Sequence, residues 1–190
     1  MIPAWNLAGV LPPIQPGEAG HSVNRSPYQV TLAEVVEGFC GSAQRVSILQ
    51  GLLNYRAALH ALGIVRGFQW LDGSFMEQVE VLEARPPQDM DVVTFFHLPA
   101  QETQASLAAK AVHLFSPAQT KASYLLDAYP CILGQPTEPR HVQQIAYWYS
   151  MWSHRRDGVW KGFVQVDLAP EEDPAARRML ELLQGGGVTP

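Results

Sequence analysis

The chain has 190 residues, of which 47% are hydrophobic and 16% are charged, and its 13 Lys and Arg and 18 Asp and Glu give a formal net charge of −5. This apolar content excludes an intrinsically disordered chain, and the length suits one domain with a substantial core. A net acidic chain is also a poor general binder of nucleic acid, because phosphate contacts need a local excess of Lys and Arg.

Residues 1–28 are rich in Pro, Gly and Asn, which predicts an extended N-terminal arm. Met1–Pro13 lacks the basic region and apolar run of a secretory signal, and polar residues interrupt the most apolar stretch, Ile48–Val65. We therefore expect a cytoplasmic protein that does not contact a membrane. Cys40 and Cys131 are far apart in the chain and are interpreted as small buried groups.

Two helices and a strand are predicted next. Thr31 and Glu34 form a capping box ahead of a short amphipathic helix. From Ser42, leucines recur every three to four residues until Gly63, which predicts a longer helix that ends at this glycine. Phe68–Leu71 is aromatic and aliphatic and follows a glycine, so it is expected to be a strand.

A strand-to-helix corner follows. Asp72 and Gly73 form a turn, and Ser74 with Glu77 matches the capping box S-x-x-E of a helix that would extend to Ala84. Gly73 and Ser74 are therefore expected where the strand becomes a helix.

The rest of the chain alternates between the two structure types. Met90–Phe96 gives the clearest strand pattern, because it is rich in β-branched and aromatic residues. The other predicted elements are helices at Gln101–Phe115, His141–Ser153 and Pro174–Gln184 and strands at Ser123–Ile132 and Val159–Leu168. This order predicts an α/β (α+β) fold: one domain over residues 29–184, with a mixed sheet flanked by helices, and a flexible tail at 185–190.

Three aspartates are the candidate catalytic and metal-binding residues. Asp89 and Asp91 enter a predicted strand two residues apart, so their side chains point the same way. Asp127 lies in the next predicted strand and can join them. Carboxylates so close would raise one another's pKa unless a divalent cation took the place of protons, which favours Mg²⁺, or Mn²⁺ in its place.

The glycine-serine corner supplies groups that can bind phosphate, which three carboxylates alone cannot do. Backbone N–H groups at a helix N-terminus, beside Gly73 and Ser74, can hold phosphate oxygens. Lys121 and Lys161 can offset phosphate charge, and Arg156 can bind phosphate in a bidentate manner. Together with the three aspartates, these five residues predict a nucleoside triphosphate site.

Each motif alone has a simpler interpretation. An aspartate pair also occurs in solvated turns, a Gly73-Ser74 corner in hairpins, and the basic cluster near Arg156 in a solvated hairpin. Asp127 could form a cap or a salt bridge at a strand edge. The aromatic residues of Tyr147–Trp152 could pack in the core, stack on a base or contact a partner.

The segments Leu71–Ser74 and Asp89–Val93 resemble the signature of the nucleotidyltransferase superfamily, which has the polymerase beta-like fold, and Asp127 takes the place of its third carboxylate. The chain is more similar to an uncharacterised bacterial nucleotidyltransferase-like family described as a domain of unknown function. The segments that carry this second resemblance are Phe68–Phe75, Pro86–Phe96, Lys121–Tyr129, Arg156–Gly158 and Lys161-Gly162.

The resemblance implies Mg²⁺-dependent transfer of a nucleoside monophosphate from an NTP to a hydroxyl, with release of pyrophosphate. The acceptor stays open between a protein side chain, an RNA 3′ end, a small molecule and a second nucleotide, although the net acidity argues against a long polynucleotide. The resemblance also suggests a bacterial toxin-antitoxin or anti-phage module. A protein partner or a second copy could complete the site. The alternative is a catalytically silent module that binds a nucleotide or a partner protein.

Overall fold

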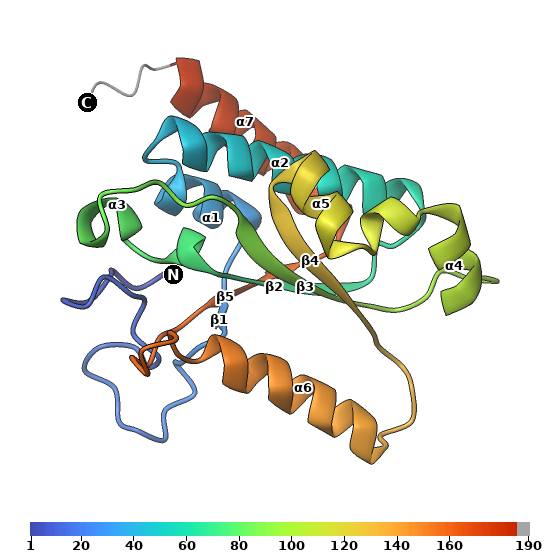
Figure 1. Ribbon diagram of the computed structural model, residues 1–190, viewed down its shortest axis with the longest axis horizontal. Coiled ribbons are helices and arrows are strands. Elements are labelled where there is room, and N and C mark those ends of the chain that lie inside the picture. The colour runs from blue at the N-terminus through green and yellow to red at the C-terminus, as the bar shows by residue number, and fades with distance from the viewer. Residues whose placement is uncertain (186–190) are drawn as a thin grey trace.

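A five-stranded mixed sheet organises the fold, in the order β1-β5-β2-β3-β4 (Figure 1). The computed structural model describes residues 1–185. The strands are β1 (Tyr28–Gln29), β2 (Gly67–Asp72), β3 (Met90–Phe96), β4 (Leu126–Ile132) and β5 (Val164–Asp167). Strand β2 pairs antiparallel with both β3 and β5, whereas β3 and β4 are parallel, as are β1 and β5. This arrangement confirms the predicted mixed α/β fold.

Helices cover both faces of this sheet. They are α1 (Leu32–Phe39), α2 (Ala43–Ala61), α3 (Val79–Leu82), α4 (Gln104–Lys110), α5 (Pro117–Tyr124), α6 (Pro139–Trp152) and α7 (Asp173–Gly185), with 3₁₀ turns η1 (Ser74–Met76), η2 (Val112–Leu114) and η3 (Pro170–Glu172). Figure 1 shows α1, α2, α5 and α7 on one side of the sheet and α6 on the other. Within residues 1–185, no helix combines the length and the apolar character needed to span a membrane.

Alternate residues of the central strands pack in two separate hydrophobic cores. On β3, Val92 and Phe96 pack in the large core with α1, α2 and α7, whereas Val93 and Phe95 pack in a smaller, mainly aromatic core with Trp148 of α6. This alternation follows from the two-residue period of a strand. The same alternation determines the face of the sheet from which each polar residue of the strand projects.

Several predicted elements are confirmed. The capping box of Thr31 and Glu34 is present at the start of α1, and the side chain of Ser42 caps α2. Gly63 follows α2 with a φ of +79°, which is the left-handed conformation expected of a glycine that ends a helix.

The predicted helix from Ser74 to Ala84 is wrong. This segment forms the 3₁₀ turn η1 and the four-residue helix α3, and Ser74 makes no capping hydrogen bond. The backbone instead bonds to distant groups. Arg45 of α2 donates to the carbonyl oxygens of Phe75 and Glu77, at 2.6 Å each. These long-range hydrogen bonds replace the helical ones.

Three other predicted elements are shorter than the sequence indicated. The strand predicted from Ser123 begins at Leu126, because α5 continues to Tyr124 and Leu125 ends it in a left-handed conformation with a φ of +59°. The strand predicted over Val159–Leu168 covers only β5, since Lys161 and Gly162 donate backbone hydrogen bonds to Ser153 and Leu11. The helix predicted over Gln101–Phe115 divides into α4 and η2. Of the predicted tail at 185–190, residues 186–190 lie outside the described part of the chain.

A buried arginine links three elements of the large core. Arg56 of α2 is fully buried, and its guanidinium donates two hydrogen bonds to Asp173 Oδ1 of α7, at 2.8 and 2.7 Å. It also donates to Gln69 Oε1 of β2 at 2.8 Å and to the carbonyl oxygen of Asp167 at 2.9 Å. The acceptors on Asp173 and Gln69, both buried, would be left without these donors if the guanidinium were removed.

We predict that Arg56→Ala lowers the free energy of unfolding by about 3–5 kcal/mol, because it leaves the Asp173 carboxylate buried and uncompensated. Urea unfolding followed by circular dichroism measures this loss. Arg178→Ala, an exposed arginine of α7, serves as the control and should change the stability by at most about 0.5 kcal/mol. A loss below about 1 kcal/mol for Arg56→Ala would contradict the role assigned to this arginine.

Candidate functional site

Three aspartates lie side by side across three adjacent strands. In the sheet register, Asp72 of β2 pairs with Asp91 of β3, and Asp91 pairs with Asp127 of β4. Residues paired in register project from the same face of a sheet. Asp91 shares its face with Val93, two residues on, which belongs to the core under α6. We call these three residues the aspartate row, and they project from the α6 face.

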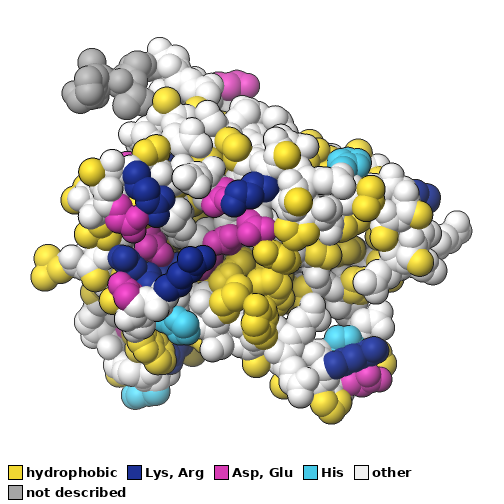
Figure 2. Space-filling view, viewed as in Figure 1, with side chains coloured by type: hydrophobic (Ala, Val, Ile, Leu, Met, Phe, Trp, Pro, Cys, Tyr) yellow, Lys and Arg dark blue, Asp and Glu magenta, His cyan; other side chains and the backbone are white. Residues whose placement is uncertain are grey.

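The aspartate row lies in a cleft of about 740 Å³, a volume typical of small-molecule sites. Figure 2 shows acidic and basic side chains gathered together on this face, with hydrophobic side chains along one border. We call this the carboxylate cleft; besides the row, its charged and glycine-serine lining comprises Gly73, Ser74, Glu77, Glu83, Arg85, Asp89, Lys121, Arg155, Arg156, Asp157 and Lys161. All eight residues that the sequence assigned to the site therefore line one cleft.

Asp91 occupies the middle of the aspartate row. Burial raises the pKa of its carboxyl to about 7, and the negative charges of Asp72, Asp89 and Asp127 add to the effect. A carboxyl group in this state is only partly ionised at neutral pH. A cation bound beside it would favour the ionised form.

Asp72 lines the cleft, although the sequence indicated it only as a turn residue within the signature-like segment Leu71–Ser74 and not as a site residue. It is 2% exposed, and burial raises its pKa to about 6 against the opposing effect of Lys161. Its Oδ1 lies 3.0 Å from Lys161 Nζ, yet it accepts no hydrogen bond from the described residues. The signal in the sequence was its position: it is the last residue of a strand, directly before Gly73.

Gly73 allows the row to lie against the backbone of the corner. Its φ is +84°, and a Cβ atom at this position would lie 2.5 Å from Asp91 Oδ2. Any side chain would therefore displace the Asp91 carboxylate. Ser74 lies at the start of a three-residue 3₁₀ turn, so the predicted phosphate cradle at a helix N-terminus is absent. The structure retains only the close approach of the Asp91 carboxylate to the backbone of Gly73.

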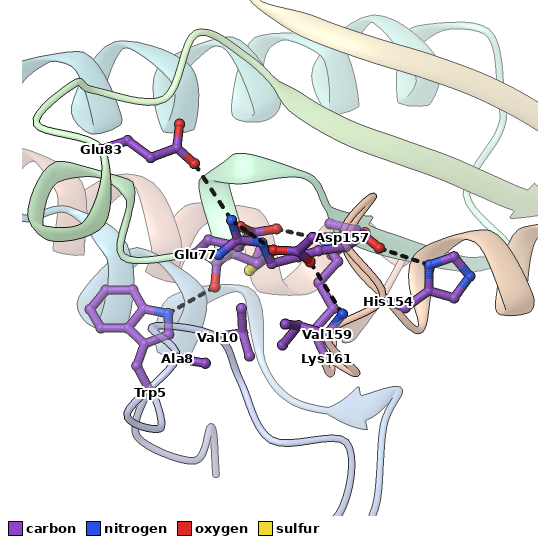
Figure 3. Close-up of polar contacts among 12 residues, drawn as sticks. Trp5, Ala8, Val10, Glu77, Glu83, His154, Asp157, Val159 and Lys161 are labelled. Carbon is purple, nitrogen blue, oxygen red and sulfur yellow. Dashed lines mark hydrogen bonds and ion pairs between the residues drawn. The ribbon is translucent and has the colours of Figure 1, made fainter.

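Lys161 neutralises two acids inside the cleft. It is 5% exposed, and its Nζ lies 3.0 Å from Asp72 Oδ1. It also lies 3.0 Å from Glu77 Oε1, a contact between two residues labelled in Figure 3. Burial acts to lower the pKa of Lys161, but the two carboxylates outweigh it and the pKa lies above the ordinary value. Lys161 therefore stays charged and is committed to these partners. Glu77, which the sequence pattern assigned to a capping box, is one of them.

Arg155 joins the two loops that border the cleft. Its guanidinium lies 3.7 Å from Glu77, 3.9 Å from Glu83 and 3.5 Å from Asp157 (Figure 3). The basic cluster in the sequence pointed to this loop, but Arg155 itself was not assigned to the site. Its contacts hold the segment after Gly73 against the segment before Lys161.

The remaining predicted cations differ in their partners. Lys121 of α5 forms an ion pair with Asp89, and the hydrogen bond to Asp89 raises the pKa of Lys121. Arg156 is exposed at the cleft and forms no ion pair within residues 1–185. Arg156 is therefore the predicted phosphate ligand that is free to meet an anion.

The carboxylates of the cleft fit a Mg²⁺ ion that is held partly by the protein and partly by a substrate. Among residues 1–185, no group of three or more His, Cys, Asp or Glu side chains is arranged to hold a metal ion by itself. Mg²⁺ in proteins usually takes one or two carboxylates together with substrate phosphates and water. Asp91 and Asp127 are neighbours in register and suit this mode, whereas lysines engage Asp72 and Asp89.

The chain belongs to the family described as a family of unknown function, DUF6932, whose profile matches residues 3–167. The match covers every residue of the carboxylate cleft named above. It confirms the expected membership of a family defined as a domain of unknown function. No curated protein and no solved structure shows a significant match to the chain.

We predict that, without divalent cations, Asp91→Asn raises the unfolding temperature by an amount that grows with pH. The unfolded chain releases the Asp91 proton near the ordinary pKa of 3.8, but the folded chain keeps it until about 7. The folded state thus binds the extra proton between these values, so the wild-type carboxylate costs more stability as pH rises through this window. Thermal unfolding in EDTA measures the difference, with about 2–4 °C expected per kcal/mol.

Glu37→Gln, an exposed carboxylate on α1, is the matched control and should show no such trend. The difference between Asp91→Asn and wild type should vanish below about pH 4 and stay constant above about pH 7. A difference that does not change with pH would contradict the raised pKa of Asp91.

Proposed function

We propose that this protein is a Mg²⁺-dependent nucleotidyltransferase that moves a nucleoside monophosphate from an NTP to a hydroxyl acceptor. The observation that carries the proposal is the aspartate row, in register across β2, β3 and β4 and directly beside Gly73. The likeness of Leu71–Ser74 and Asp89–Val93 to the nucleotidyltransferase superfamily adds support, because the strands β2 and β3 that carry these motifs are adjacent.

The chemistry would be an in-line displacement at the α-phosphate. The acceptor oxygen forms a bond to phosphorus, the bond from phosphorus to the β-phosphate oxygen breaks, and pyrophosphate leaves. Mg²⁺, which Asp91 and Asp127 would hold, supplies charge neutralisation of the phosphates and a lowered pKa of the acceptor hydroxyl when it is bound. The proton of the hydroxyl passes to the aspartate row or to water.

The other cleft residues would bind and orient the substrate. Arg156 is free to pair with a phosphate group. Gly73 lets the Asp91 carboxylate lie against the backbone of the corner, since it has no Cβ. Lys161 holds Asp72 and Glu77 in place and keeps the charge of this corner balanced, which makes it a positioning residue.

One observation favours a second candidate function. Four cleft cations already have acidic partners, so fewer are free for a triphosphate than the sequence indicated: Arg85, Lys121, Arg155 and Lys161. A catalytically silent module that binds a nucleotide or a partner protein would tolerate this arrangement. It would bind nucleotide at the cleft without transferring any part of it.

The test incubates the protein with each NTP, labelled in turn at the α- and the γ-phosphate, with Mg²⁺ and cell extract. We expect the α label, and not the γ label, to move to an acceptor. Asp91→Asn should lower this transfer by about 10²–10³-fold, the usual cost of removing one electrostatic partner of a transition state. Asp167→Asn, an aspartate at the end of β5 outside the cleft, should transfer at the wild-type rate.

Equal transfer by wild type and Asp91→Asn would refute the enzymatic proposal. Movement of the γ label alone would indicate a kinase. Nucleotide binding that Asp91→Asn weakens, with no transfer of either label, would favour the silent module.

A further inference from the structure

One wall of the carboxylate cleft is aromatic. Tyr129 and Trp152 line it, together with the apolar side chain of Met151. Tyr129 follows Asp127 by two residues on β4, so both side chains project from the same face of the sheet. The hydrophobic border of the charged hollow in Figure 2 shows how closely apolar and acidic side chains meet on this face.

The ring of Tyr129 packs against buried aromatic side chains of the smaller core. Its ring centroid lies 4.6 Å from that of Trp148 of α6. Trp148 in turn contacts Trp152 at 5.8 Å, and Trp152 contacts Phe163 at 5.8 Å. Trp148 and Trp152 are only 8% and 3% exposed. Tyr129 is therefore the accessible end of a packed aromatic stack, and little side-chain freedom remains to be lost when a ligand contacts it.

Tyr129 lies directly beside the aspartate row. Its side chain projects from the same face as that of Asp127, two residues earlier on β4, and its hydroxyl lies close to the Asp127 carboxylate. A nucleotide whose α-phosphate lies at Asp127 would thus have its base within reach of the Tyr129 ring. Arg156, which lines the same cleft and forms no ion pair within residues 1–185, suits the phosphates.

We propose that Tyr129 is the stacking platform for the nucleobase of the bound nucleotide. This inference rests on the proposed function, because it takes the nucleotide to be the ligand of the aspartate row. Stacking on an aromatic ring accepts every base, since each base has a π face. The platform would therefore select nucleoside triphosphates over free polyphosphate while discriminating little between bases.

The test compares ligands with and without a base. Calorimetry with Mg²⁺ measures the binding of ATP, CTP and inorganic tripolyphosphate to each variant. Tyr129→Leu keeps an apolar contact with Trp148 but removes the π face, and it should weaken ATP and CTP by about tenfold or more. Binding of tripolyphosphate should not change. Tyr129→Phe keeps the ring and should bind ATP and CTP as wild type does.

Tyr147→Ala is the matched control. Tyr147 also contacts Trp148, at 5.2 Å, but it is 57% exposed and does not line the cleft, so this variant should bind all three ligands normally. Equal ATP affinity in wild type and Tyr129→Leu would overturn the inference and leave the proposed function standing. If wild type binds neither ATP nor tripolyphosphate, the proposed function fails together with the inference.

Discussion

Like charges placed opposite one another in a sheet repel, and the repulsion among the three aspartates determines the properties of the site. Asp72, Asp91 and Asp127 are neighbours in register, an arrangement that destabilises a sheet when the charges are not compensated. The protein compensates one end of the row with Lys161 and leaves the middle with a raised pKa. Perturbed carboxyl groups in a cleft are typical of functional sites. The row therefore costs the sheet stability, and the cation of the proposed function would compensate its charge.

The scaffold holds the row through contacts between segments that are far apart in the chain. Arg45 of α2 bonds to the backbone of the corner after Gly73, and its guanidinium stacks 5.6 Å from the ring centroid of Trp5 in the N-terminal arm. Trp5 Nε1 donates to the carbonyl oxygen of Met76 at 2.8 Å (Figure 3). The backbone N–H of Gly162, next to Lys161, donates to the arm at Leu11. The arm thus contacts the segment that follows Gly73 and the residue that follows Lys161.

Much of the fold could be predicted from the sequence, because its signals are local. Hydrophobic periodicity and caps identified α1 and α2, and β-branched residues identified β3. The corner after Gly73 could not be predicted in the same way. The S-x-x-E pattern there is a genuine capping signal, but Arg45 and Lys161, both distant in sequence, bond to this segment and change its structure. Asp72 was missed for the same reason: its pairing with Asp91 depends on strand register, which spacing alone does not fix.

The proposed function requires that Asp91 and Asp127 together hold a divalent cation that also contacts the substrate phosphates. A crystal structure with Mn²⁺ and a non-hydrolysable NTP analogue tests it most directly, since anomalous scattering locates the metal without reference to activity. We expect a Mn²⁺ ion bonded to an oxygen of each of these carboxylates, at about the 2.1 Å typical of such small hard cations. A well-ordered nucleotide with the metal bonded to neither aspartate would contradict it.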